Sequence, residues 1–190
     1  YPQLALLGID RDEAALAKAA ETLAFASGRT RFVRGNYSEL AGIAAENGWK
    51  KVDGILLDIG VSSPQIDRPE RGFSWRAEGP LDMRMDRRSE LTASRLLNTA
   101  AERELERIFR EYGEVAKSRK LAAAVVRARQ EKPFAVTSDL VALCDGVLGR
   151  SRPGQLPAPT LVFQALRIAV NDELGELERA LPAATELLNR

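Results

Sequence analysis

The segment from Asp53 to Asp86 constrains the fold of this chain more than any other part of it. It begins with an apolar run, Gly54 to Leu57, that is typical of a buried parallel strand ending at Asp58. The residues that follow are interrupted by glycine and proline, but they also include Trp, Phe, Met and Leu, which favours an ordered functional loop over disorder. A carboxylate at the carboxyl end of a strand, followed by a polar loop, is where an open α/β sheet binds its ligand.

The first part of the chain alternates apolar strand patterns with helical patterns. This alternation predicts a doubly wound parallel sheet of the α/β class. The predicted strands are Leu4–Ile9, Arg31–Arg34 and Val52–Leu57, and the predicted helices are Asp12–Phe25 and a short helix, capped by Ser38, that runs through Ala45.

The second half of the chain is predicted to be helical. Leu105, Ile108, Phe109 and Tyr112 recur at the spacing of one helix face. Further predictions are a helix around Leu121–Val126, a helix from a cap at Ser138 through Leu148, a connector at Gly149–Pro159, and one long amphipathic helix from Phe163 to Leu181.

Histidine is absent and Cys144 is the only cysteine, so several classes of chemistry are excluded for this sequence. A Ser-His-Asp triad, a His-ligated metal, a structural zinc site and an intrachain disulfide cannot form. No metal ligands are predicted. No apolar run is long enough to cross a bilayer, and the first ten residues lack the basic region of a signal peptide. We therefore expect a cytoplasmic protein that does not meet a membrane.

Polar side chains follow each predicted strand. Asp10 ends the first strand, where a carboxylate either offers two acceptor oxygens to the hydroxyls of a ribose or caps the next helix. Tyr37 follows the second strand, where its ring either flanks an adenine or packs as a satellite core aromatic. Asp58 ends the third strand, where it either accepts from an exocyclic amine or holds the next loop through backbone N–H groups.

The turn Ser62-Ser63-Pro64-Gln65 is similar to the Asp/Asn/Ser-Pro-Pro-aromatic motif of amino-group methyltransferases. In that motif a side-chain oxygen and a backbone carbonyl accept the hydrogens of the amine, and its nitrogen attacks a sulfonium methyl in line. This chemistry needs positioning and acceptors rather than a strong base, which suits a chain without histidine. The alternative is an ordinary Ser-Pro turn.

The chain is locally basic between Val115 and Pro133, where six Lys and Arg residues outnumber a single acidic residue. Such a stretch follows the phosphates of a nucleic acid, or else it is a solvated helix face. The residues predicted to contact RNA are Lys117, Arg119, Lys120 and Arg127.

Together, these motifs closely resemble the bacterial ribosomal RNA small subunit methyltransferase H family. The resemblance covers nearly the whole chain, and its most specific part is Gly54–Asp86. It implies a Rossmann-like core that uses S-adenosylmethionine (S-adenosyl-L-methionine), incomplete here, with a helical insertion domain. It also implies methylation of the N4 amine of a cytosine in small-subunit (16S) ribosomal RNA. The other matching segments are Leu6–Ala19, Ile108–Glu114 and Phe163–Leu181.

The resemblance also implies roles for individual residues. Asp58, Ser62, Ser63 and Pro64 would be catalytic, beside the transferred methyl, and the loop Arg71–Asp86 would cover the site. The residues that match the family's cofactor contacts are Asp10, Tyr37 (often Phe in the family), Asp58 and Gln65.

We expect residues 1–65 to form the first part of the core, 66–157 the active-site loop and RNA-recognition insertion, and 158–190 the return helix of the core. The expected partner is small-subunit ribosomal RNA or a ribosomal particle, and a homodimer stays open. Two alternatives remain. One is a non-catalytic RNA-binding module, and the other is a fragment of an NAD-dependent oxidoreductase, because an Asp after a strand also binds the ribose of NAD.

The chain departs from the family pattern in three places. The family's first strand, the glycine-rich loop that follows it and the strands after the last helix are missing, so we expect an internal fragment that is aggregation-prone, inactive alone and without tight cofactor binding. In the family's strand order the missing first strand lies between the strands ending in Asp10 and Asp58, so we predict that these two are separated by a gap or paired non-natively. The family's His-Pro-Ala-Thr-Arg run is replaced by Leu156–Leu161, without the His and the Arg.

Overall fold

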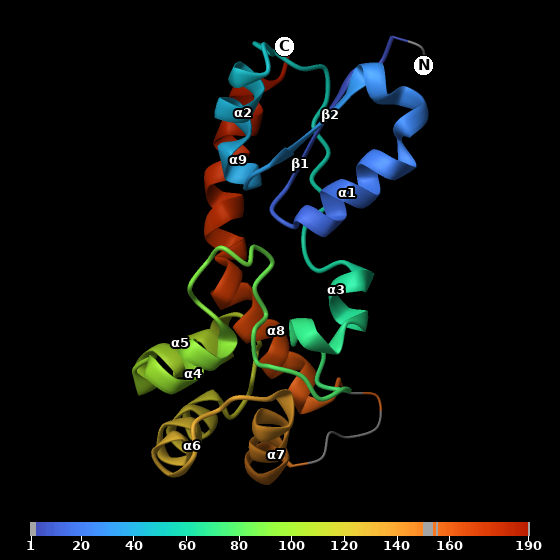
Figure 1. Cartoon of the computed structure of the whole chain (residues 1–190). Helices are drawn as coiled ribbons and strands as arrows, with labels where there is room; N and C mark the ends of the chain where they lie inside the picture. Colours follow the sequence, from blue (N-terminus) through green and yellow to red (C-terminus); the bar gives the residue numbers. More distant parts are fainter. Residues whose placement is uncertain (1–2, 150–153, 155, 190) are drawn as a thin grey trace. The chain divides into compact units, whose positions relative to one another are not determined.

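The computed structural model describes residues 3–149, 154 and 156–189 (Figure 1). Contacts between residues divide the chain into two compact units. Unit 1 comprises Tyr1–Ile59, Met85–Arg87 and Asp172–Arg190, and unit 2 comprises Gly60–Arg84 and Arg88–Asn171. The segments 1–65, 66–157 and 158–190 were derived from the family pattern rather than from contacts, and they stay a prediction.

Unit 1 contains a parallel pair of strands. β1 (Leu6–Asp10) pairs with β2 (Thr30–Arg34), in a register that places Asp10 opposite Arg34. The connection between them is α1 (Glu13–Thr22) followed by a 3₁₀ helix, η1 (Ala24–Arg29). Parallel strands require such a crossover, because a short hairpin cannot join their ends. The first two predicted strands and the helix between them are therefore confirmed.

The third predicted strand, Val52–Leu57, is wrong. Only Val52 forms a bridge, to Leu188, and residues 54–59 pair with no other part of the chain that the structure describes. Leu56 is 90% exposed, so the run is not buried either. A strand is stabilised by hydrogen bonds to its neighbours, and β1 pairs with β2 alone. Within the described residues, neither strand of this pair bonds to residues 54–59, which agrees with the expected gap between the run and β1.

The hydrophobic core of unit 1 is small. A 3₁₀ turn, η2 (Tyr37–Glu39), leads into α2 (Leu40–Glu46), and both pack against α9 (Glu173–Leu187) (Figure 1). One cluster of buried residues consists of Leu40, Ala180 and Ala184, and partly buried Ile9, Tyr37, Ile55, Ala183 and Leu187 pack against it.

The cap predicted at Ser38 is wrong. Asn36 occupies the N-cap position of η2, and its backbone N donates to Glu39 Oε2 at 2.8 Å in a capping box. The Ser38 hydroxyl donates instead to the carboxylate of Glu176 on α9. Glu176 lies far away in the sequence, so local spacing could not reveal this competing acceptor.

Unit 2 is helical. Its apolar helix faces meet in one core, to which Leu97, Leu105, Ile108, Phe109, Leu121, Val125, Leu140, Val162 and Leu166 contribute buried side chains. The helices are α3 (Ser63–Asp67), the 3₁₀ turn η3 (Pro69–Arg71), α4 (Ala93–Thr99), α5 (Glu102–Glu111), α6 (Ser118–Glu131), α7 (Thr137–Leu148) and α8 (Ala158–Asn171). In the described part of the chain, no helix is long and apolar enough to cross a membrane. The predicted helices around Ile108, Leu121 and Leu148 are confirmed, and the predicted connector at Gly149–Pro159 lies partly outside the described residues.

The cap predicted at Ser138 is also wrong. α7 already begins at Thr137, and the carboxylate of Asp139 accepts from the backbone N of Val136 at 3.1 Å. Ser138 donates its hydroxyl to Glu78 Oε2 at 2.6 Å. A carboxylate near a helix N-terminus also interacts favourably with the helix dipole, which explains why Asp139 takes the role expected of the serine.

The long helix predicted from Phe163 to Leu181 is two helices. α8 ends at Asn171, and Asp172 adopts a left-handed conformation with φ 49° before α9 begins. A non-glycine residue seldom adopts positive φ, and helical hydrogen bonding cannot continue through it. The apolar periodicity passes over this break, because periodicity reports which positions are apolar and not the conformation of the residues between them.

Cys144 is fully buried in α7, and burial raises the pKa of its thiol to about 12. Because only the thiolate reacts quickly, we expect iodoacetamide to leave Cys144 unmodified in the folded protein at pH 8. Modification should become stoichiometric in denaturant, as measured by mass spectrometry. Rapid modification in native buffer would contradict this burial.

Candidate functional site

Asp10 lies at the carboxyl end of β1, exposed to solvent. Its Oδ1 accepts from the backbone N of Asp12 at 2.7 Å, and Asp12 is the residue that caps α1, accepting from Ala14 N at 3.1 Å. The capping role considered for Asp10 therefore belongs to Asp12. Asp10 Oδ2 accepts no hydrogen bond from any residue that the structure describes, so this oxygen can still accept from a ribose hydroxyl.

Arg34 is a charged residue at the same edge of the sheet that the sequence analysis missed. It lies opposite Asp10 in the register of the strands, and its guanidinium donates to Glu13 and Asp86, each at 3.1 Å. Its Nε is buried without a hydrogen-bond partner among the described residues. Its position at the end of the second predicted strand, beside Asp10 in a parallel pair, was the signal that could have revealed it.

Tyr37 begins η2, directly after the turn that follows β2. Its hydroxyl donates to the backbone O of Glu173 at 2.8 Å, and the Arg11 guanidinium carbon lies 5.9 Å from the ring centre. Burial raises the pKa of the phenol above its ordinary value, so the hydroxyl stays a donor at neutral pH. The ring also packs against the core of unit 1. Tyr37 therefore packs as a satellite core aromatic, as the alternative prediction states. Its ring is only partly buried, and it lies near the edge of the sheet where Asp10 lies.

Asp58 is exposed in the irregular segment that replaces the third predicted strand. Its carboxylate forms no hydrogen bond or ion pair with any residue in the described ranges. The alternative in which Asp58 holds the next loop through backbone N–H groups is therefore wrong. Asp58 lies in unit 1, as do Asp10 and Tyr37.

The Ser62–Gln65 turn lies in unit 2, where it forms the first turn of α3. Ser62 is the N-cap residue, and its backbone N donates to Gln65 Oε1 at 3.1 Å in a capping box. Gln65 is only 6% exposed, whereas Ser62, Ser63 and Pro64 are exposed to solvent. The turn thus presents its serines and proline outward, and the oxygen of Gln65 accepts a hydrogen bond within the cap.

The loop Arg71–Asp86 is held by its own apolar residues. Leu81 and Met83 are fully buried, and Met83 adopts φ 60°. The backbone N of Met83 donates to Arg71 O at 3.0 Å, and its backbone O accepts from Asn171 Nδ2 at 2.8 Å. The ordered loop expected from its Trp, Phe, Met and Leu content is confirmed, and its role as a cover stays a prediction.

The basic stretch splits into structural and solvent-exposed residues. Arg129 Nη1 donates to the backbone O atoms of Leu97 and Ala100 at the end of α4, and Lys132 pairs with Asp139 at 2.6 Å. Lys132 is exposed but paired, and the other exposed basic residues are the four predicted to contact RNA, Lys117, Arg119, Lys120 and Arg127.

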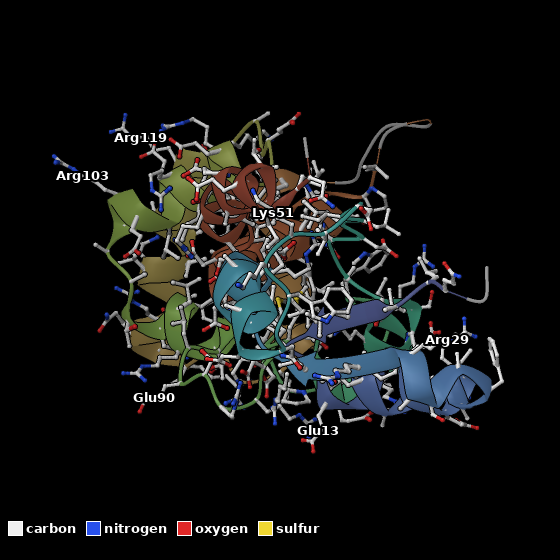
Figure 2. The ribbon with its side chains drawn as sticks, turned by 90° about the horizontal axis from the view of Figure 1, so that it is seen from above. Glu13, Arg29, Lys51, Glu90, Arg103 and Arg119 are labelled. Carbon is white, nitrogen blue, oxygen red and sulfur yellow. The ribbon has the colours of Figure 1, made fainter. Side chains whose placement is uncertain are left out.

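Three of the four exposed residues are unpaired in the described part of the chain. Lys117 donates weakly to Leu148 O at 3.4 Å, whereas Arg119, Lys120 and Arg127 form no ion pair or side-chain hydrogen bond with any described residue. Figure 2 shows Arg119, and Arg103 on the adjacent α5, extending away from the ribbon. A hollow of about 680 Å³ lies beside them, lined by Glu102, Glu106, Ala116, Lys117, Ser118, Arg119, Lys120 and Ala123. The exposed cations are therefore available to an anionic partner.

The two parallel strands and the crossover helix between them form a βαβ unit, which places the protein in the α/β class. The sequence model of the MraW methylase family matches residues 1–190, and the chain belongs to this family. In the described ranges, no group of three or more His, Cys, Asp or Glu side chains is arranged to hold a metal ion.

Curated relatives of the chain carry the name Ribosomal RNA small subunit methyltransferase H. The protein from Methylobacterium sp. (strain 4-46) is 50% identical over 98% of the chain, that from Heliobacterium modesticaldum is 49% identical over 96%, and that from Geobacter sp. (strain M21) is 45% identical over 100%. The chain spans 55%, 59% and 61% of the lengths of these three relatives.

Proposed function

We propose that the protein carrying this chain transfers a methyl group from S-adenosylmethionine to the N4 amine of a cytosine in small-subunit (16S) ribosomal RNA. The observation that carries the proposal is the match of the MraW methylase family to residues 1–190, with relatives named for methylation of small-subunit ribosomal RNA. The same match disfavours the alternative of an NAD-dependent oxidoreductase.

The residues of unit 1 fit the polar groups of an adenosyl cofactor. Asp10 presents a carboxylate oxygen without a partner among the described residues at the end of β1, where it would accept from the ribose hydroxyls. Tyr37 follows β2 with its ring fixed at one end, where it would flank the adenine. Gln65 stays a predicted further contact, and its Oε1 accepts from the backbone N of Ser62.

Asp58 and the Ser62–Pro64 turn are assigned to the transfer step. When bound, the cofactor supplies an electrophilic sulfonium methyl. The Asp58 carboxylate, exposed and without a partner in the described residues, would accept a hydrogen bond from the target amine and orient the nitrogen lone pair. The exposed turn would accept from the other amine hydrogen through an oxygen of Ser62, Ser63 or Pro64. The C–N bond forms as the C–S bond breaks, and the amine releases a proton to solvent.

A methylation assay tests the proposal directly. The intact protein, small ribosomal subunits and S-adenosylmethionine labelled in its methyl group are incubated, and the RNA is digested to nucleosides. We expect the label in N4-methylcytidine, identified by mass spectrometry. Label in a different nucleoside would overturn the assignment. So would a lack of methyl transfer both to RNA in the small subunit and to free RNA.

The exposed basic residues of α6 are proposed to contact RNA phosphates. Replacing Lys117, Arg119 and Lys120 together by alanine is expected to weaken RNA binding. The plot of log K, where K is the association constant, against log salt concentration should become less steep by about 2, since each lost contact with single-stranded RNA contributes about 0.7. Fluorescence anisotropy over a salt series measures this slope. The matched control replaces Lys18, Lys50 and Lys51, which are exposed in unit 1 and have the same total charge. An equal effect of both triple variants would indicate a general charge effect and not a contact by α6.

A further inference from the structure

Glu176, on α9, is a buried carboxylate that the proposed chemistry does not use. It is only 8% exposed, and it accepts from the hydroxyl of Ser38, from Asn36 Nδ2 at 3.3 Å and from Arg179 Nη2 at 2.9 Å. A buried charge is costly unless several donors compensate it. The three donors provide that compensation, and two of them come from one short turn of unit 1.

That turn is the one that carries Tyr37. Asn36 and Ser38 are the residues directly before and after Tyr37, so the Glu176 carboxylate binds the side chains of both neighbours of Tyr37. The Tyr37 hydroxyl donates to the backbone O of Glu173, one helical turn earlier on α9. Tyr37 is therefore linked to α9 by its own hydroxyl and by the side chains of its two neighbours.

Arg179 completes the arrangement from the solvent side. Its Nη2 lies 2.6 Å from Asp172 Oδ2 and 2.9 Å from Glu176 Oε1, and the hydrogen bond to Asp172 raises the pKa of the guanidinium. Its side chain is half exposed, so the pairing with Asp172 is screened by water. The hydrogen bonds from Asn36 and Ser38 to buried Glu176 are shielded from water, so they fix the turn Asn36–Ser38 more strongly than the pairing of Arg179 with Asp172 does.

We propose that Glu176 is a positioning residue for the cofactor, because it fixes the turn that sets the orientation of the Tyr37 ring against the adenine. This inference rests on the proposed function, in which Tyr37 flanks that base. Glu176 itself does not contact the cofactor in the proposed arrangement. Its effect on binding passes through Tyr37, and this distinguishes it from a residue that merely stabilises the fold.

The test is Glu176→Gln in the intact protein, with S-adenosylhomocysteine as the probe in calorimetric titration. Glutamine keeps the size of the side chain, but it loses the charge and one acceptor oxygen, so the turn loses charge-assisted hydrogen bonds. We expect the Kd to rise about tenfold. The matched control is Glu178→Gln, two residues away on the same helix, exposed and without a hydrogen-bond partner among the described residues, and its Kd should not change.

A double-mutant cycle shows whether the effect passes through Tyr37. Tyr37→Ala alone should weaken binding, and adding Glu176→Gln to it should cause no further change. If Tyr37→Ala weakens binding and Glu176→Gln does not, or if the two effects multiply, the positioning role is refuted while the proposed function stands. If Tyr37→Ala leaves binding of the probe unchanged, the proposed contact between Tyr37 and adenine fails, and the inference fails with it.

A second variant keeps the test valid if Glu176→Gln does not fold. Ser38→Ala removes one donor to the same carboxylate and leaves its charge in place. We expect a Kd rise of about threefold, again absent in the Tyr37→Ala background. An unchanged Kd in Ser38→Ala would overturn the proposal without reference to Glu176→Gln.

Discussion

Replacing Asp58 by alanine is expected to abolish methyl transfer while the affinity for RNA stays unchanged. Asp58 is exposed, and none of the described residues contacts its carboxylate, so its removal should not disturb the fold. If the carboxylate orients the target amine, kcat/KM should fall at least about a hundredfold, the range observed when one preorganised transition-state contact is removed. Initial rates with methyl-labelled cofactor and anisotropy with labelled RNA give the two quantities separately.

Two further variants test whether the loss of activity is specific to the carboxylate of Asp58. Asp67→Ala removes another exposed carboxylate without a partner in the described residues, at the end of α3, and it should retain full activity. Asp58→Asn keeps an acceptor oxygen without the charge, and it should show an intermediate rate. Full methylation by Asp58→Ala would refute the catalytic role, whereas RNA binding with no methylation even by the unaltered intact protein would favour the RNA-binding module.

Replacing Gly72 by alanine is expected to destabilise unit 2 severely. Gly72 has φ 70°, and a Cβ built there would lie 2.0 Å from the backbone O of Pro80, in the loop Arg71–Asp86. Left-handed φ costs a residue with a side chain about 1 kcal/mol, and overpacking adds about 1–3 kcal/mol. We therefore expect the free energy of unfolding to fall by about 2–4 kcal/mol, measured by urea denaturation followed by circular dichroism.

The matched control is Gly146→Ala. Gly146 lies in α7 with open space around its Cβ position, and its φ is not in the left-handed region. Alanine should therefore stabilise the helix by about 0.5–1 kcal/mol, the opposite sign to the effect at Gly72. Equal stability of Gly72→Ala and the unaltered protein would mean that the close approach of Gly72 to Pro80 is absent in solution.

Local patterns in the sequence predicted α5, α6 and α7 of unit 2, but they missed α3 and α4 and the break after α8. Leu105, Ile108 and Phe109 recur at helical spacing, and all three are fully buried in α5. A helix satisfies its backbone hydrogen bonds within a short segment, so its sequence alone carries the information needed. The same reasoning failed for Val52–Leu57, because the hydrogen bonds of a strand must come from a neighbouring strand.

The candidate site was predictable only in part. The positions of Asp10 and Tyr37 after β1 and β2 follow from the strand pattern. The hydrogen bonds that these residues make do not follow from it. Glu173 and Glu176 come from a helix more than a hundred residues away, and they determine the environment of Tyr37 and its neighbours.

By itself, the sequence determined the helices α1, α2, α5, α6 and α7, the parallel pair of β1 and β2, the family and the exclusion of histidine chemistry. Tertiary structure alone decided which cations other parts of the chain engage. Arg129 and Lys132 have the same charge as Arg119 and Lys120, but backbone carbonyls and Asp139 engage the first two. The carbonyls that Arg129 contacts lie 32 and 29 positions away in the sequence, and the order of residue types along the chain does not show which segments pack together.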